Sequence, residues 1–195
     1  MDILKLPVSL NVQGQELAIN ADWRPCVNVM RMFERTDLTD TEKILCMVEI
    51  LYVDEVPDSL VSDAAEQAIW FLNLGEDPRE KETTRAHSTG RLFSWEQDLK
   101  YIISAVEHSA GIPIRSKDFY HFWEFMSAFF ESGDCILNTL IHQRKQKKLG
   151  KQTKAEREWW AENKDIAELK VELTKDEQEV LDAFNALLKG GEQDG

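Results

Sequence analysis

Two amphipathic helical patterns decide the fold of this chain: SWEQDLKYIISAVEHSAG at residues 94–111 and SKDFYHFWEFMSAFFES at residues 116–132. Gly111-Ile112-Pro113 separates them. The first should open with a capping box formed by Ser94 and Gln97 and end at Gly111, and the second should begin at Ser116 or Lys117. Together they form the densest apolar and aromatic part of the chain and predict the centre of its core.

The second pattern has apolar groups around most of its circumference, which predicts burial on several sides. An aromatic stripe of this kind is far more often core than a ligand site. Its members recur at three- and four-residue intervals, with Tyr120 and Phe125 on other faces: Phe119, Phe122, Trp123, Met126, Phe129 and Phe130.

The N-terminal part predicts a hairpin followed by helices. LKLPVSLNV (4–12) and ELAINADW (16–23) alternate apolar and polar residues around a turn at Gln13-Gly14, which is typical of paired strands. Pro25 suits the first turn of a helix. Thr39 and Glu42 form a capping box for a helix with an apolar face of Ile44, Leu45, Val48 and Leu51, and Asp58 is a candidate cap for a helix that ends at Gly75.

Further helices are predicted after Gly133. CILNTLIHQRKQKKL (135–149) is apolar in its first half and basic in its second. Thr153 with Glu156 and Thr174 with Glu177 are capping boxes for AEREWWAENK (155–164) and DEQEVLDAFNALLK (176–189). The fold class is therefore mainly α, a helical bundle of about seven to eight helices with a short N-terminal β-hairpin.

The domain prediction follows from composition. Residues 1–150 should form the hairpin and helical core, and residues 151–195 a C-terminal helical extension. Residues 76–91 hold no large apolar side chain and mix charges with Thr, Ser, Gly and Pro, so we expect a mobile loop there. Ordering on a partner is the alternative for so long a loop.

Charge and cysteine usage restrict the function. The 195 residues carry a formal charge of −13 with a pI of about 4.8, so the molecule should repel nucleic acid and anionic lipid. No apolar run is long enough to span a membrane, and we expect a soluble intracellular protein. Cys26, Cys46 and Cys135 should be buried free thiols, and the histidines form no pair at zinc-ligand spacing.

One local charge signal stands out against this acidic background. Seven of the 23 basic residues lie in a fourteen-residue window, either complementing a helix C-terminus or forming a dock for an acidic surface, including another copy of the chain. Aromatics that would stack nucleic-acid bases are absent from the run. The window contains Arg144, Lys145, Lys147, Lys148, Lys151, Lys154 and Arg157.

Trp159 and Trp160 follow this window in a polar helix. Only one of two adjacent positions can point cleanly inward, so either one tryptophan is an exposed partner anchor or the helix folds back and buries both. The candidate partner-binding residues are thus Arg144, Lys145, Lys147, Lys148, Lys151, Lys154, Trp159 and Trp160.

No pattern of catalytic residues is present. The sequence has no phosphate-binding glycine loop, no nucleophile elbow and no HExxH helix. With 36 acidic residues, accidental carboxylate pairs such as Glu96 and Asp98 carry little information. We therefore expect a non-catalytic protein without a cofactor or a metal.

Several ordered pieces of the sequence carry a resemblance. They are Ala68-Ile69-Trp70-Phe71-Leu72-Asn73 with Gly75, Phe93-Ser94-Trp95-Glu96-Gln97-Asp98 with Tyr101-Ile102, Gly111-Ile112, His121-Phe122-Trp123-Glu124-Phe125, and Arg144. In these, over residues 20 to 165, the chain resembles a family of mostly helical proteins from tailed bacteriophages of Gram-positive hosts, known from the fifteenth gene product of a Listeria phage. Phe122 stands where that family tends to have a second tryptophan, and the extension from Asp165 to Gly195 is longer than the family's.

The resemblance implies a role in tail morphogenesis in the host cytoplasm. Genes of this family lie between those for the tail tube and the tape measure, where tail assembly chaperones are encoded. The implied partners are the tape measure protein, which such a chaperone would hold until the tube polymerises, the tail tube protein, and further copies of the chain. The alternative is a structural tail or neck adaptor that stays in the virion. The family supplies no catalytic residues.

Overall fold

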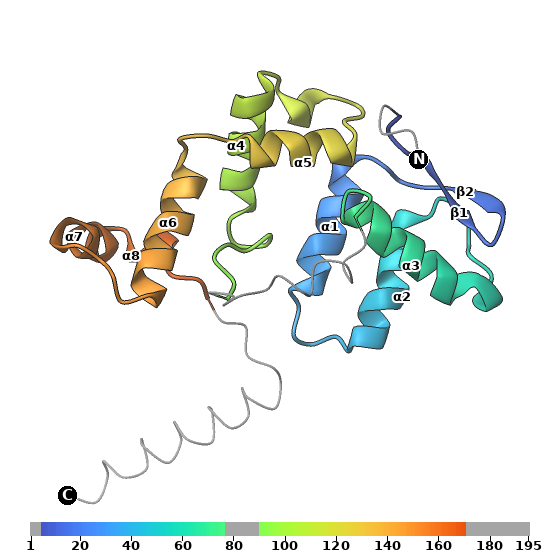
Figure 1. Cartoon of the computed structure of the whole chain (residues 1–195), viewed down its shortest axis with the longest axis horizontal. Helices are drawn as coiled ribbons and strands as arrows, with labels where there is room; N and C mark the ends of the chain where they lie inside the picture. Colours follow the sequence, from blue (N-terminus) through green and yellow to red (C-terminus); the bar gives the residue numbers. More distant parts are fainter. Residues whose placement is uncertain (1–4, 77–89, 171–195) are drawn as a thin grey trace, which may run out of the picture.

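A computed structural model describes residues 5–76 and 90–170 of the chain, with the hairpin at one end and α6–α8 at the other (Figure 1). The mainly helical fold class with an N-terminal hairpin is confirmed. The elements are β1 (Ser9–Val12), β2 (Gln15–Ala18), α1 (Trp23–Phe33), α2 (Asp40–Leu51), η1 (Asp58–Leu60), α3 (Val61–Leu72), α4 (Leu99–Ala110), η3 (Ile114–Ser116), α5 (Phe122–Phe130), α6 (Ile136–Lys148), α7 (Lys154–Glu162) and α8 (Lys164–Ala167).

The hairpin lies against α3. Its strands are antiparallel, with Leu10 opposite Leu17, and the inward residues Leu10 and Val12 are buried. A two-stranded hairpin is not stable alone in water, so this packing provides the apolar surface that it needs. The Tyr52 hydroxyl, at the end of α2, donates to the Ala64 carbonyl at 2.9 Å, and burial raises the pKa of this phenol.

Helix α5 is the aromatic centre predicted from the sequence. Phe122 and Phe125 are fully buried, and the Phe125 ring stacks on Trp23 of α1 with centroids 5.2 Å apart. The Trp123 indole donates to the Phe71 carbonyl at 2.9 Å, which joins α5 to the end of α3. These contacts place α5 between the N-terminal helices and α4 (Figure 1).

The predicted start of α5 is wrong. The helix begins at Phe122 rather than at residue 116 or 117, because the preceding backbone pairs with the segment before α1. Trp23 N–H donates to the Tyr120 carbonyl, and Phe122 N–H donates to the Ala21 carbonyl. These long-range bonds hold residues 120–122 extended, and tertiary pairing overrides their helical pattern.

His121 ends that extended segment and caps α5. Its Nδ1 accepts from Trp123 N–H at 3.0 Å, so Nε2 carries the proton of the neutral ring and donates to the Pro7 carbonyl at 2.9 Å. The side chain is 1% exposed. One imidazole thus accepts a hydrogen bond from a backbone N–H at the N-terminus of α5 and binds the backbone of the segment before β1.

The buried faces of α5 and α2 differ in part from the predicted ones. Phe119 and Phe130 are 54% and 65% exposed, since they lie before the start and at the last residue of α5. On α2 the buried stripe is Met47, Val48 and Leu51, whereas Ile44 and Leu45, in the first half of the helix, are exposed.

The remaining local predictions have mixed outcomes. The capping boxes at Thr39 and Thr153 are confirmed. Ser94 accepts from Gln97 N–H, but the reciprocal partner is the Asp98 carboxylate, and α4 begins only at Leu99. Asp58 makes no side-chain cap and starts η1 instead. Cys26 is buried as predicted, whereas Cys46 and Cys135 are half-buried.

Some predictions fall outside the described residues. These are most of the expected loop at 76–91 and the expected helix at 176–189 with its capping box at Thr174. Within the described ranges, no helix is long and apolar enough to cross a membrane. The domain boundary at residue 150 stays a prediction.

Among the glycines in the described ranges, Gly75 has the closest neighbouring atoms. It ends the segment after α3 with a φ of +84°. A Cβ at this position would lie 3.1 Å from the Trp70 ring and 3.2 Å from the Trp123 ring. Gly111 has a φ of +67° but open space around it. A side chain would therefore strain the backbone at both positions, but it would meet neighbouring atoms only at Gly75.

Replacing both glycines separates these effects. We expect Gly111→Ala to lower the free energy of unfolding by about 1 kcal/mol through left-handed strain alone. Gly75→Ala should cost about 1–3 kcal/mol more, because the half-buried rings of Trp70 and Trp123 must move. Urea unfolding followed by tryptophan fluorescence measures both, and equal losses would contradict the packing role of Gly75.

Candidate functional site

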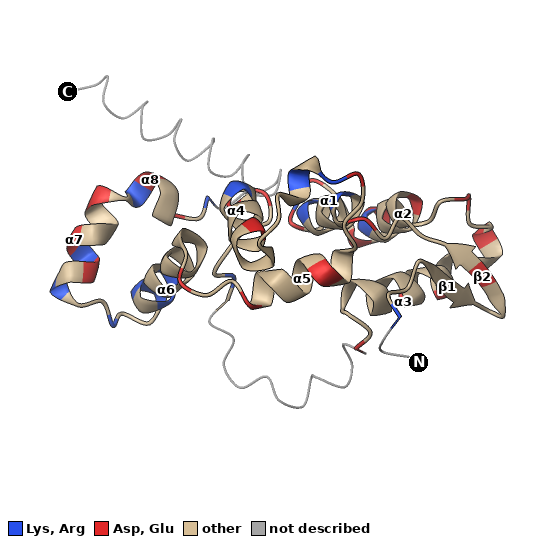
Figure 2. Cartoon of the chain, turned by 90° about the horizontal axis from the view of Figure 1, so that it is seen from above, with Lys and Arg blue, Asp and Glu red and all other residues tan. Residues whose placement is uncertain are grey.

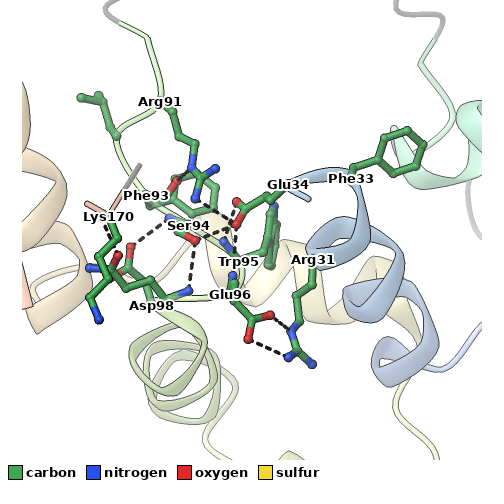
Figure 3. Close-up of polar contacts among 12 residues, drawn as sticks. Arg31, Phe33, Glu34, Arg91, Phe93, Ser94, Trp95, Glu96, Asp98 and Lys170 are labelled. Atoms are coloured by element: carbon green, nitrogen blue, oxygen red, sulfur yellow. Dashed lines mark hydrogen bonds and ion pairs between the residues drawn. The ribbon is translucent and has the colours of Figure 1, made fainter. Parts of the chain in front are cut away.

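The site is built around the C-terminal end of α1, where the Glu34 side chain forms hydrogen bonds with the segment that leads into α4 (Figure 3). Its carboxylate accepts from Trp95 N–H at 2.8 Å, from the Ser94 hydroxyl at 2.6 Å and from Glu96 N–H at 3.2 Å. The Arg91 guanidinium donates to the same carboxylate at 3.0 Å. Glu34 therefore caps the turn before α4 as a negatively charged group at a helix N-terminus would.

A second link runs between the same elements. Arg31 of α1 donates two hydrogen bonds to the Glu96 carboxylate, at 2.5 and 2.9 Å. This bidentate pair lowers the pKa of Glu96. Both side chains are partly exposed, so the pair orients the turn more than it stabilises the fold.

Behind this turn lies a buried ion pair between Asp98 and Arg144. Asp98 is 0% and Arg144 3% exposed, and the guanidinium donates to both carboxylate oxygens, at 2.6 and 3.0 Å. Asp98 also accepts from Ser94 N–H at 2.9 Å. A buried charge of this kind needs a partner and full hydrogen bonding.

Arg144 meets that requirement with all five of its N–H groups. Besides Asp98, it donates to the carbonyls of Ala167 at 2.6 Å, Ile166 at 3.0 Å and Leu92 at 3.2 Å. Those three carbonyls belong to α8 and to the segment before α4. A single side chain of α6 thus forms hydrogen bonds with both α8 and the segment before α4.

The chain beyond α8 is held at the same place. The Gln97 amide donates to the Glu168 carbonyl at 2.7 Å and accepts from Lys170 N–H at 2.9 Å. This two-point contact is the reason that residues 168–170 lie beside the turn before α4.

The basic end of α6 projects from this framework. Lys148 Nζ donates to the Arg91 carbonyl at 2.6 Å, and Lys147 Nζ lies 3.9 Å from the centroid of the Trp160 ring, a cation–π contact. Figure 2 shows basic positions on α6 and at the start of α7, at the end of the molecule opposite the hairpin.

These groups enclose a cleft of about 1180 Å³, called here the basic cleft. Its walls are the end of α1, the turn before α4, the basic end of α6 and residues 168–170. Cations outnumber carboxylates among its lining side chains. The cations are Arg31, Arg35, Arg91, Arg144, Lys147, Lys148 and Lys170, and the carboxylates are Glu34, Asp37, Glu96 and Glu168.

A second hollow, of about 540 Å³, shares Glu34 and Arg91 with the basic cleft. It is called here the aromatic hollow, because its apolar lining includes Phe93, Trp95, Phe129, Phe130 and Ile141. The rings are in mutual contact, with centroids 5.5 to 5.7 Å apart. A charged and an aromatic recess therefore lie beside each other.

The structure divides the predicted partner-binding residues. Arg144 departs from the expected exposed dock, because it is buried in its ion pair. Lys147, Lys148 and Trp160 line the basic cleft, and both tryptophans are half-buried. Lys145, Lys151 and Lys154 are exposed but do not line it. Partner binding by the exposed residues stays a prediction.

Sequence reasoning missed Glu34 and Asp98. Glu34 lies in no motif, and Asp98, although it ends the resemblance segment Phe93–Asp98, is indistinguishable by sequence from an accidental carboxylate pair with Glu96. One signal was present: Arg144 continues the stripe of Leu137 and Leu140, both fully buried, at a helical interval of four. A cation on an apolar stripe predicts a buried carboxylate partner. Among the described residues, no group of three His, Cys, Asp or Glu side chains could hold a metal ion.

The buried pair should be intolerant of removing one partner. We expect Asp98→Asn and Arg144→Met each to lower the free energy of unfolding by about 3–5 kcal/mol, since either leaves an uncompensated buried charge or lost bonds. The double variant should lose less than the sum of the two. Urea unfolding of the four proteins completes the cycle.

Arg115→Gln is the matched control, because Arg115 pairs with Glu107 on an exposed surface. Its loss of stability should be much smaller. Additive effects of Asp98→Asn and Arg144→Met, or single losses no larger than that of Arg115→Gln, would contradict the buried-pair account.

Comparison with known proteins extends the resemblance. No curated protein and no solved structure matches the chain. The sequence pattern of the family described as Bacteriophage Gp15 protein matches residues 3–169, which include the aromatic hollow, all of the basic cleft except Lys170, and nearly all of the described structure. The chain therefore belongs to the bacteriophage Gp15 protein family.

Proposed function

We propose that this protein is a non-catalytic tail assembly chaperone that holds the phage tape measure protein during tail morphogenesis. The observation that carries the proposal is the family match over residues 3–169, together with the tail-module position that the resemblance implies. Acting in the host cytoplasm, it would keep a long, hydrophobic client dispersed until tube subunits assemble around it.

The aromatic hollow suits this task. Phe130 is 65% exposed at its edge, and exposed aromatic groups beside a recess commonly anchor protein partners. An apolar side chain of a client helix would enter the hollow. Lys147 and Lys148 at the adjoining basic cleft would pair with carboxylates on the same client helix, which sets its position and direction.

The net charge of −13 supports the same role. A strongly charged protein that coats a hydrophobic client keeps the assembly soluble by mutual repulsion. The tail tube protein is a second candidate partner, because it must displace the chaperone as the tube grows.

A structural tail or neck adaptor is the second candidate function. The observation that favours it is the basic cleft on an otherwise acidic chain, since oppositely charged surfaces allow copies to assemble. Mass spectrometry of purified particles separates the two functions. A chaperone should be absent or scarce in particles, whereas an adaptor should be present in a fixed ratio to tail proteins.

Client capture gives a sharper test. In cells that co-express the tape measure protein, the wild-type chain should raise client solubility and copurify with it. Phe130→Glu should reduce capture about tenfold or more, as expected for the loss of one aromatic anchor. Quantitative mass spectrometry of the pull-down measures the ratio of client to chaperone.

Phe119→Glu is the control for this test. Phe119 is similarly exposed, at 54%, but does not line the aromatic hollow, so its variant should capture the client normally. Failure of the wild-type chain to capture the client would refute the chaperone function. Equal losses in both variants would refute the assignment of the client site to the aromatic hollow.

A further inference from the structure

The basic cleft is suited to an anionic occupant. Seven cations and four carboxylates line it. Arg31, Arg35, Arg91 and Arg144 each pair with a carboxylate, so the excess comes from the lysines Lys147, Lys148 and Lys170. The excess of positive charge stands out in a chain of net charge −13. A concave site with a local excess of one sign concentrates ligands of the opposite sign.

The end of the described structure lies at this cleft. Lys170 lines it, and the two bonds to Gln97 hold residues 168–170 at its rim. Whatever follows Lys170 therefore starts beside the basic side chains. A segment attached at the rim reaches an effective concentration in the millimolar range, so even a weak intrinsic attraction suffices for occupancy.

The sequence after Lys170 has the complementary charge. VELTKDEQEVLDAFNALLKGGEQDG, residues 171–195, contains seven Asp or Glu residues and two Lys. It also carries apolar residues, among them Val180, Leu181 and Phe184, and the cleft offers Met32, Trp160 and Leu169. The family match ends at residue 169, so this acidic segment lies outside the family pattern.

We propose that residues 171–195 bind the basic cleft of their own chain. Carboxylates of the segment pair with Lys147 and Lys148, and its apolar residues contact Trp160 and Met32. The inference does not depend on which client the protein holds.

Zero-length cross-linking of the full chain tests this directly. A carbodiimide joins a carboxylate to a lysine amine as an amide only where the two are in contact. We expect cross-links from carboxylates of residues 171–195 to Lys147 and Lys148. Lys151 and Lys154 are the internal controls, because they are equally basic and exposed but lie outside the cleft lining.

The salt dependence of the cross-links tests whether charge pairs hold the segment, and isotope labelling tests whether it binds its own chain. The yield to Lys147 and Lys148 should fall about fivefold or more between 0.05 and 0.5 M NaCl, because salt screens exposed charge pairs. In a mixture of ¹⁴N- and ¹⁵N-labelled protein, the cross-linked peptides should pair within one isotope only. Mixed-isotope pairs would show that the segment of a second copy occupies the cleft, which overturns the proposal.

A functional readout uses the full chain in the same way. Charge reversal by Lys147→Glu with Lys148→Glu should increase hydrogen exchange of the backbone amides in residues 171–195 severalfold. Lys151→Glu with Lys154→Glu makes the same change in net charge outside the cleft and should leave exchange unchanged. Equal exchange in both double variants, or cross-links distributed evenly over the four lysines, would overturn the proposal.

Discussion

The buried pair between Asp98 and Arg144 is the interaction on which the arrangement of the α6–α8 end of the molecule depends. Apolar side chains form most of the core, but the described contacts of residues 166–168 include three polar bonds to Arg144 and Gln97. An ion pair buried in this way contributes little net stability compared with apolar packing. Its contribution is geometric, because a guanidinium with five fixed donors allows only one arrangement of the segments around it.

This geometry explains why two different recesses lie beside each other. Glu34 holds the turn before α4 from the side of α1, and Arg144 holds it from the side of α6. The turn exposes aromatic side chains toward one recess and polar groups toward the other. A helix with both apolar and acidic residues would meet the aromatic hollow and the basic cleft together, which is the arrangement that the proposed client binding requires.

The sequence predicted local features well, because local features depend on residues close in the chain. The boxes at Thr39 and Thr153 need only a partner three positions away, and the hairpin needs only alternation around Gln13-Gly14. The start of α5 could not be predicted in this way, since its extended lead-in is set by Ala21 and Trp23, a hundred residues earlier. Arg144 was grouped with the surface lysines for the same reason: its partner Asp98 lies 46 positions away.

The pieces that carry the family resemblance also gain a physical meaning. The segment Phe93–Asp98 contains Ser94, Trp95 and Asp98, and the resemblance also includes Arg144. In the structure these residues form one hydrogen-bonded unit with Glu34. This part of the resemblance therefore follows the framework that positions both recesses.

The most direct test of this account is the guanidinium NMR spectrum of Arg144 in the ¹⁵N-labelled full chain. Five hydrogen-bonded donors should stop rotation of the group and slow its exchange with water, which predicts separate, persistent Hη resonances at neutral pH. The exposed Arg115 and Arg157 should give averaged, rapidly exchanging signals. An averaged Arg144 signal that resembles theirs would contradict the claim that this side chain fixes the arrangement of the α6–α8 end of the molecule.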